Sequence, residues 1–304
     1  MARPVPVLCA TILLGAFLAP AFADDLAPEA LLEQRAPTVV SLRFVLKSGG
    51  TESPTEAHGT VVDPTGLVVL PNDELGGEGV KVSDLKVIFG SDPKEWEAVV
   101  VARDKNLSLA YLQVLGLGDK AVPAVDFSAG VEPKIGLTLF GITRDGRGFD
   151  YAPSIQRCYV SSRVEKPRVM WGLSGDFGSA GLPVYDAAGR PAGLLADQES
   201  SEGAAEEGQG TMSATFLLTL ADVNKSLAAA KKRVPEAVAK AEAAKKEAPE
   251  PAVTPTPGTG GAGMGEAPPS PSNPAPPAPE TPAPKAPTPT PKPPEAPKAP
   301  ETPK

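Results

Sequence analysis

Histidine, cysteine and aromatic residues are scarce in this chain of 304 residues. It contains one histidine, two cysteines and two tryptophans, and aromatic residues make up 5% of it. The single histidine, His58, excludes a zinc site built from several imidazoles, and no Cys/His cluster has metal-ligand spacing. The glycine-rich stretches Gly76–Gly79 and Gly258–Gly265 lack the strand and helix that flank a phosphate-binding loop. We therefore expect neither a metal nor another cofactor.

Positive charge is also in deficit. The chain has 29 Lys and Arg against 37 Asp and Glu, a net charge of −8. Nucleic-acid binding needs clustered positive charge, and no basic patch interleaved with aromatic residues occurs. We expect no nucleic-acid partner.

No apolar run is long enough to span a bilayer, which takes about 20 residues in a helix. The longest run, Val7–Leu18, follows the positive charge of Arg3 and precedes Ala21-Phe22-Ala23, a small-x-small sequence of the kind that signal peptidase cuts. This order is typical of a signal peptide. We expect residues 1–23 to be removed and the protein to be exported to the periplasm, cell envelope or extracellular space, without a transmembrane segment.

Loss of residues 1–23 would remove Cys9 and leave Cys158 as the last cysteine. An intramolecular disulfide is then excluded, so an ordinary apolar core must stabilise the fold. Cys158 lies in Ile155–Val160, a strand-like run, and a nucleophilic thiol usually has a basic partner nearby. The pattern favours a packed thiol.

The composition changes near Pro235. About 20 of the 37 prolines lie between Pro251 and the carboxyl terminus, among Ala, Thr, Lys and Glu. Such a segment cannot bury enough apolar area to fold, so we expect residues 234–304 to form a disordered tail, helical at most over Pro235–Glu247. The tail could be a spacer or tether, or a ligand for a proline-binding module.

The body, residues 26–233, consists mostly of short apolar runs separated by turn signals such as Asp63-Pro64-Thr65-Gly66. Even spacing with few helices predicts an all-β barrel or sandwich. Two helices are expected, Pro28–Gln34 and Ala221–Lys232, the second capped by Thr219. The expected strands are Thr38–Leu46, His58–Asp63, Leu67–Leu70, Leu85–Phe89, Trp96–Ala102, Leu109–Val114, Leu137–Ile142, Ser154–Ser161, Leu182–Tyr185, Ala192–Ala196 and Met212–Leu218.

Four segments, in this order and spacing, resemble the trypsin-like serine proteases, most closely the HtrA/Deg type. Val39–Leu42 is similar to that family's opening strand, and His58–Leu70 (HGTVVDPTGLVVL) to its Gly-x-Gly…Asp-x-x-Gly signature. Ala98–Leu112 is similar to the strand pair around its catalytic aspartate, and Gly178–Arg190 (GSAGLPVYDAAGR) to its nucleophile loop and hairpin. The resemblance implies an all-β fold of two six-stranded-type β-barrels followed by a carboxyl-terminal helix. The proline-rich tail stands where the family often carries PDZ domains.

The catalytic side chains of the family are all replaced. Such an enzyme needs a serine nucleophile, a histidine base and a carboxylate that orients the histidine. The resemblance places Asp73 at the histidine position, Ser108 at the aspartate position and Ala180 at the serine position. We therefore expect a pseudoprotease, a serine protease homologue that is not an enzyme.

Neither neighbouring residue restores the chemistry. His58 falls in the barrel strand before Gly59, away from the base position, and an aspartate at position 73 is too weak a base to activate a serine. Ser179, one residue before Ala180, should point away from the site because a shift of one residue on a tight turn redirects the side chain.

What remains could bind. The resemblance implies that the amides of Gly178 and Ala180 still form an oxyanion hole, and that a strand edge between the barrels can pair with an extended peptide or protein partner. Phe177 and Leu182 replace small residues of the family and could fill this groove. The alternatives are a structural or tethering envelope protein and an active endopeptidase with a non-standard site. Trimers are common in the family, but the amino-terminal segment on which they depend has no match here.

Overall fold

Two groups of six strands follow one another along the chain. The computed structural model describes residues 25–199 and 213–247, so the expected signal peptide, most of the tail and Gly258–Gly265 lie outside the described residues. The strands of the first group are β1 (Val39–Ser48), β2 (Thr51–Asp63), β3 (Leu67–Pro71), β4 (Lys81–Phe89), β5 (Glu95–Asp104) and β6 (Leu109–Val114). Those of the second are β7 (Thr138–Arg144), β8 (Pro153–Val164), β9 (Met170–Gly175), β10 (Pro183–Tyr185), β11 (Pro191–Glu199) and β12 (Ser213–Leu218).

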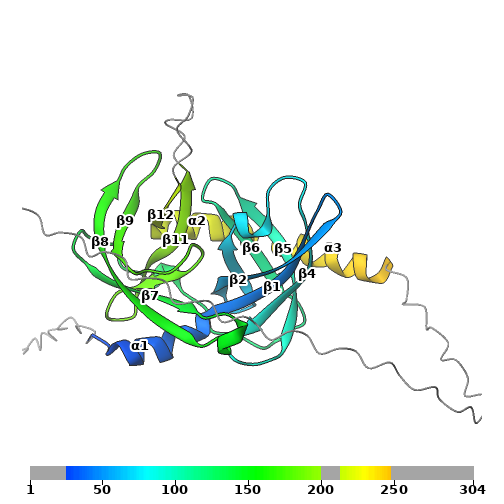
Figure 1. The fold of residues 1–304 in the computed structure, drawn as a ribbon, viewed down its shortest axis with the longest axis horizontal. Coiled ribbons are helices and arrows are strands. Elements are labelled where there is room, and N and C mark those ends of the chain that lie inside the picture. The colour runs from blue at the N-terminus through cyan, green and yellow to red at the C-terminus, as the bar shows by residue number, and fades with distance from the viewer. Residues whose placement is uncertain (1–24, 200–212, 248–304) are drawn as a thin grey trace, which may run out of the picture. The chain divides into compact units, whose positions relative to one another are not determined.

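Each group closes into an antiparallel barrel (Figure 1). The strand order is β1-β2-β3-β6-β5-β4 in the first barrel and β10-β11-β12-β9-β8-β7 in the second. The predicted fold class, two six-stranded barrels followed by a helix, is confirmed. The pair of barrels fits the trypsin-like double-barrel fold.

Strands β3 and β6 are buried on both faces, which explains why their sequences are continuous apolar runs. On β6, Ala110 and Leu112 pack in the core of the first barrel, whereas Leu109 and Tyr111 pack in the cluster that includes the core of the second. Val68 and Val69 of β3 divide in the same way. Successive side chains of a strand point to opposite faces, so these two strands form the wall shared with the second barrel.

The described residues contain three α-helices beside the barrels: α1 (Pro28–Arg35), α2 (Leu220–Lys231) and α3 (Val234–Glu247). The predicted cap of α2 is confirmed, because the Thr219 hydroxyl accepts a hydrogen bond from the Asp222 amide at 3.2 Å. Short 3-10 helices occur at η1 (Ala36–Thr38), η2 (Asp73–Leu75), η3 (Phe127–Ala129) and η4 (Arg147–Phe149). None of the described helices has the length and apolar character that crossing a membrane requires.

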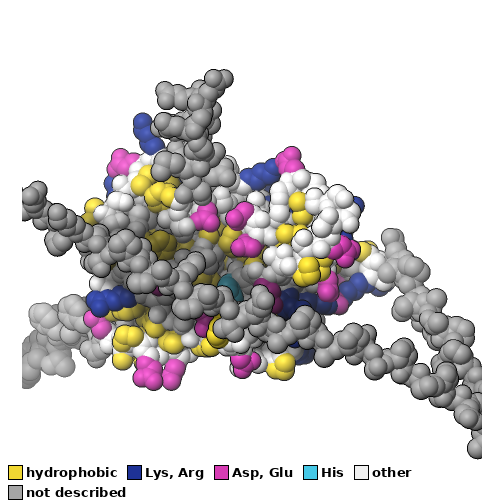
Figure 2. Space-filling view, in the orientation of Figure 1, with side chains coloured by type: hydrophobic (Ala, Val, Ile, Leu, Met, Phe, Trp, Pro, Cys, Tyr) yellow, Lys and Arg dark blue, Asp and Glu magenta, His cyan; other side chains and the backbone are white. Residues whose placement is uncertain are grey.

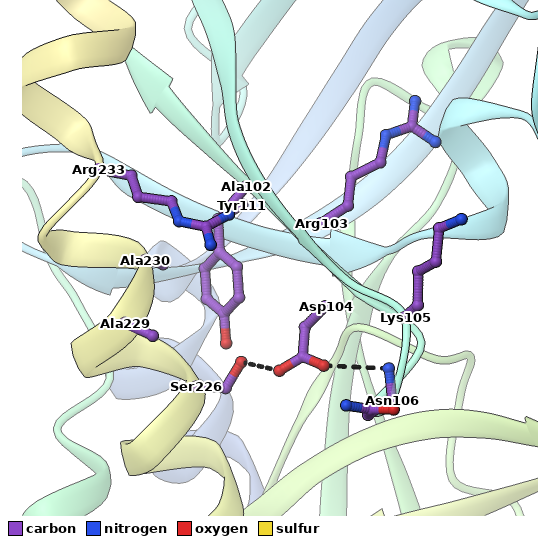
Figure 3. A pocket seen from close by; sticks show the side chains of 10 residues that line it. All are labelled: Ala102, Arg103, Asp104, Lys105, Asn106, Tyr111, Ser226, Ala229, Ala230 and Arg233. Atoms are coloured by element: carbon purple, nitrogen blue, oxygen red, sulfur yellow. Dashed lines mark hydrogen bonds between the residues drawn. The ribbon is translucent and has the colours of Figure 1, made fainter.

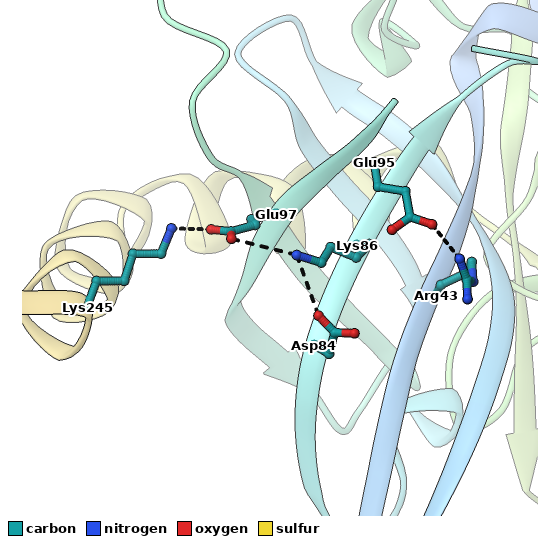
Figure 4. Close-up of polar contacts among 6 residues, drawn as sticks. All are labelled: Arg43, Asp84, Lys86, Glu95, Glu97 and Lys245. Carbon is teal, nitrogen blue, oxygen red and sulfur yellow. Dashed lines mark hydrogen bonds and ion pairs between the residues drawn. The ribbon is translucent and has the colours of Figure 1, made fainter. Parts of the chain in front are cut away.

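A network of ion pairs joins helix α3 to the outer surface of the first barrel (Figure 4). Lys245 pairs with Glu97 of β5, and Glu97 also lies 3.6 Å from the ammonium group of Lys86, which in turn lies 3.5 Å from Asp84. Exposed pairs of this kind each contribute little to stability. Lys and Arg side chains are interspersed with Asp and Glu on the face that Figure 2 shows.

The structure differs from the predicted elements at several places. Residues 234–247, which the sequence assigns to the tail, form the helix α3, and β4 begins at Lys81 rather than Leu85. β2 begins at Thr51 rather than His58, because the residues from Thr51 to Glu56 pair with β1 in a long hairpin whose largely exposed side chains carry no strand signal. β9 has no counterpart among the predicted strands. Its sequence contains Gly172, where a Cβ atom would lie 2.2 Å from the Ser162 hydroxyl, so β8 and β9 approach closely there.

Candidate functional site

Asp73 and Ser108, which the resemblance places at the histidine and aspartate positions, lie on neighbouring segments. Asp73 is exposed in η2, after the end of β3, and Ser108 is half-buried in the turn directly before β6. The amide of Asn72 donates to the carbonyl of Ser108 at 2.9 Å. Ser108 has a φ of 55°, a left-handed conformation that is uncommon outside glycine. One backbone hydrogen bond thus joins the two segments.

The loop between β9 and β10 brings the third position to the same place. Ala180 is 5% exposed, and a Cβ atom on the next residue, Gly181, would lie 2.5 Å from Pro71 Cδ at the end of β3. The hydroxyl of Thr60 on β2 donates to the Gly181 carbonyl at 2.7 Å. The close approach of residue 181 to Pro71 and its φ of 80° both require glycine at this position.

These positions hold a carboxylate, a hydroxyl and a methyl group. Ala180 offers no nucleophilic atom, and no imidazole stands at position 73. Ser179 is exposed, and none of the hydrogen bonds among the described residues joins its hydroxyl to a base. No described group of His, Cys, Asp and Glu side chains could hold a metal ion.

The backbone amides of Gly178 and Ala180 are the remaining groups of the nucleophile loop. Among the hydrogen bonds of the described residues, neither amide is used as a donor. Gly178 has a φ of 88°, and the buried Gln156 Oε1 would lie 3.1 Å from a Cβ atom there. The geometry is compatible with the predicted oxyanion hole, which stays a prediction.

The side chains of Phe177 and Leu182 both contact the apolar cluster that includes the core of the second barrel. Leu182 is fully buried in that core, and Phe177 packs partly buried against it. Because Leu182 Cδ1 would lie 3.3 Å from a Cβ atom at Gly178, the idea that these two side chains fill a peptide groove stays a prediction.

Beside these positions, no strand among the described residues pairs with one edge of β11 beyond Leu194. β11 pairs with β12 from Leu194 to Glu199, but with β10 only as far as Leu194. Leu195 still donates to the Leu182 carbonyl at 3.0 Å and accepts from the Gly181 amide at 2.8 Å. Backbone groups alternate in direction along a strand, so Asp197 turns its N–H and C=O to the same side as Leu195, away from β12.

Three carboxylates, those of Asp73, Glu74 and Asp197, lie near one another at this edge, and Arg103 donates to the Leu75 and Gly76 carbonyls beside them. The pKa of Glu74 is raised by burial and by the negative charges of Asp73 and Asp197. These charges come from η2 and β11, one on each barrel. The surroundings therefore favour a positively charged ligand over a negatively charged one.

The thiol of Cys158 is a packed group, as predicted. Cys158 is 2% exposed on β8 and lies 3.7 Å from the Leu139 carbonyl. Burial and the nearby charge of Asp176 raise its pKa to about 11. A thiol in this state is a poor nucleophile.

A separate pocket of about 290 Å³ lies between β5 and α2 (Figure 3). Asp104 accepts hydrogen bonds there from the Ser226 hydroxyl at 2.7 Å and the Asn106 amide at 3.1 Å. Burial raises the pKa of Tyr111, whose ring lines the pocket, to about 12. The polar contacts of this pocket fasten α2 to the first barrel.

His58 lies on β2, opposite Ser41 of β1. The positive charge of Arg144 on β7 is close enough to act on its imidazole ring. Burial lowers the pKa of His58, as does the charge of Arg144, while Glu56 and Asp145 act in the opposite direction. Its Nδ1 atom is buried without a hydrogen-bond partner among the described residues. The surroundings therefore favour neutral imidazole.

Protonation of His58 is expected to destabilise the fold. Because its pKa is lowered on folding, its contribution is complete above the ordinary value of 6.5 and is lost as the pH falls through the folded-state pKa. We expect the urea midpoint of the wild type to fall more between pH 7.5 and 5.5 than that of His58→Gln. Glu74→Gln is a control, because the raised pKa of the Glu74 carboxyl has the opposite effect on stability. Parallel profiles of wild type and His58→Gln would contradict this expectation.

Compared with models of known protein families and with curated protein sequences, the chain has no match. The two closed six-stranded barrels fit a trypsin-like double-barrel fold. The three positions that the sequence singled out meet where the barrels join.

Sequence reasoning missed two residues at this junction. Arg144 joins the barrels through backbone carbonyls, and Gln198 reaches across this edge of β11. Their sequence surroundings carry no signal for these contacts, because the acceptors are carbonyl groups that any residue provides.

Proposed function

We propose that this protein is a catalytically inactive relative of HtrA/Deg-type serine proteases that binds extended segments of partner proteins. The observation that carries the proposal is an edge of β11 with which no described strand pairs, next to a nucleophile position occupied by Ala180. We further propose that the protein is exported and that its proline-rich tail acts as a spacer.

The chemistry of peptide hydrolysis is missing at each step. Attack on a carbonyl carbon needs an activated hydroxyl, and position 180 has only a methyl group. Proton transfer to the leaving amine needs a group such as imidazole, which the exposed carboxylate of Asp73 does not replace. The amides of Gly178 and Ala180, which donate to no acceptor among the described residues, support retention of carbonyl binding without cleavage.

Binding by strand addition needs an unpaired N–H and C=O on an accessible edge. Asp197 turns both groups to the side of β11 that faces away from β12, where its C=O accepts from the Gln198 side chain and no described strand pairs with it. An extended peptide that pairs there gains main-chain hydrogen bonds, while its side chains meet the surrounding surface. The edge lies beside the loop that contains Ala180, since Leu195 bonds both Gly181 and Leu182.

Two assays of the purified protein test the absence of catalysis. We expect no cleavage of fluorescent casein and no labelling by a fluorophosphonate probe, with trypsin as the positive control. Cleavage accompanied by labelling of one serine would overturn the proposal and support an endopeptidase with a non-standard site. Binding is tested separately, with the peptides described below.

A further inference from the structure

No described strand pairs with β11 at Asp197, but the side chain of Gln198 makes hydrogen bonds there. Gln198 Nε2 donates to the carbonyl of its neighbour Asp197 at 2.9 Å and to the carbonyl of Leu107 at 3.3 Å. Leu107 belongs to the first barrel and precedes Ser108. One carboxamide group has two N–H donors, and here they join the edge of the second barrel to the first.

The Gln198 carboxamide donates to the same carbonyl group with which an added peptide strand would pair. The carbonyl of Asp197 is one of the two groups with which an added strand would pair. A peptide amide and the side-chain amide of Gln198 are the same kind of donor, so they compete for one acceptor. Because Gln198 is half-buried rather than enclosed, its side chain can leave without opening the core.

We infer that Gln198 is a built-in competitor at the β11 edge, which an extended, positively charged segment of a partner protein displaces. This inference rests on the peptide-binding function proposed above. It adds the charge of the partner and the contact that must break when the partner binds.

The charge of the partner follows from the carboxylates at the edge. Asp73 is exposed in η2 and Asp197 is half-buried on β11, and after burial the charges of these two residues raise the pKa of Glu74 further. A segment with Lys or Arg side chains reduces this repulsion, whereas an acidic segment increases it. Proline cannot donate at the pairing position, which makes the proline-rich tail of this chain a poor occupant.

The probe is a fluorescent ten-residue peptide of alternating valine and lysine, measured by polarisation with the purified full chain. We expect Gln198→Leu to bind it about 3- to 10-fold more tightly than wild type, since a competing hydrogen bond of ordinary strength is removed. Gln198→Ser should act in the same direction. Gln34→Leu, a change at an exposed glutamine on α1, should leave the affinity unchanged.

Two further peptides separate strand pairing from charge. A valine–glutamate peptide should bind more weakly, and an N-methylated valine–lysine peptide, with equal charge but fewer N–H donors, should lose affinity. Equal binding of the N-methylated peptide would overturn pairing at the edge. Equal affinity of wild type and both Gln198 variants would overturn the role of Gln198 alone. Binding of neither charged peptide by any variant would overturn the proposed function as well.

Discussion

The variant Asp73→His/Ser108→Asp/Ala180→Ser is expected to react with a fluorophosphonate probe at residue 180, whereas the wild type does not. The Asn72–Ser108 hydrogen bond already holds the first two positions together, and Gly181 packs against the end of β3. Loss of triad residues in a serine protease costs about 10⁴- to 10⁶-fold in rate, so even incomplete restoration should speed labelling by about 100-fold or more. Mass spectrometry of the labelled protein would identify the modified residue.

Two controls define what this result would mean. Ala180→Ser alone should label little, because a serine without a base is weakly nucleophilic. The double variant Asp73→His/Ser108→Asp, which keeps Ala180, should not label at position 180. A folded triple variant that fails to react would show that these positions do not correspond to a triad, and the proposed family would lose its main support.

The barrels could be predicted because their signal is local. Strands such as β3 and β6 are apolar runs between turn residues, and their boundaries follow from the sequence within a residue or two. The first half of β2 could not be predicted in this way, since its exposed residues are held by pairing with β1. Register between strands is a property of two segments, not of one.

The candidate site also contains residues that the sequence predicts and residues that it does not. Asp73, Ser108 and Ala180 follow from the order of motifs, and the structure brings their segments together. Gln198 and Leu107 are 91 positions apart, and Arg144 is 105 positions from Val39. Contacts at such separations depend on how the barrels pack, so the sequence alone does not reveal them.

Replacement of Arg144 by methionine is expected to lower the free energy of unfolding by about 3–5 kcal/mol, because buried carbonyls lose their donor. Arg144 is 6% exposed, and its guanidinium group donates to the carbonyls of Val39 at 2.7 Å, Ala36 at 2.8 Å and Tyr151 at 2.9 Å. The first two acceptors precede the first barrel or begin it, whereas Arg144 ends β7 of the second. One side chain therefore fastens one barrel to the other.

Burial of the Arg144 cation is unfavourable, whereas its hydrogen bonds are favourable. The difference between these two contributions determines how much stability Arg144→Met loses. Removal of the guanidinium group from water lowers the pKa of Arg144, and no ion pair among the described residues compensates it. The hydrogen bonds must offset that cost, because a buried carbonyl without a donor is itself unfavourable. Methionine removes the charge and takes one donor from each of the three carbonyls, although the Ala36 carbonyl keeps the Val39 amide as a donor. Lysine keeps the charge but lacks the planar fork, so Arg144→Lys should fall between wild type and Arg144→Met.

Urea unfolding measures the difference, and Arg147→Met is the matched control. Arg147 is exposed on the same hairpin, and none of the described hydrogen bonds uses its side chain, so its replacement should change stability by less than about 0.5 kcal/mol. A loss of less than about 1 kcal/mol in Arg144→Met would mean that the desolvation cost of the cation cancels its hydrogen bonds. The junction between the barrels would then depend on the apolar wall of β3 and β6, since these strands supply buried contacts to both cores.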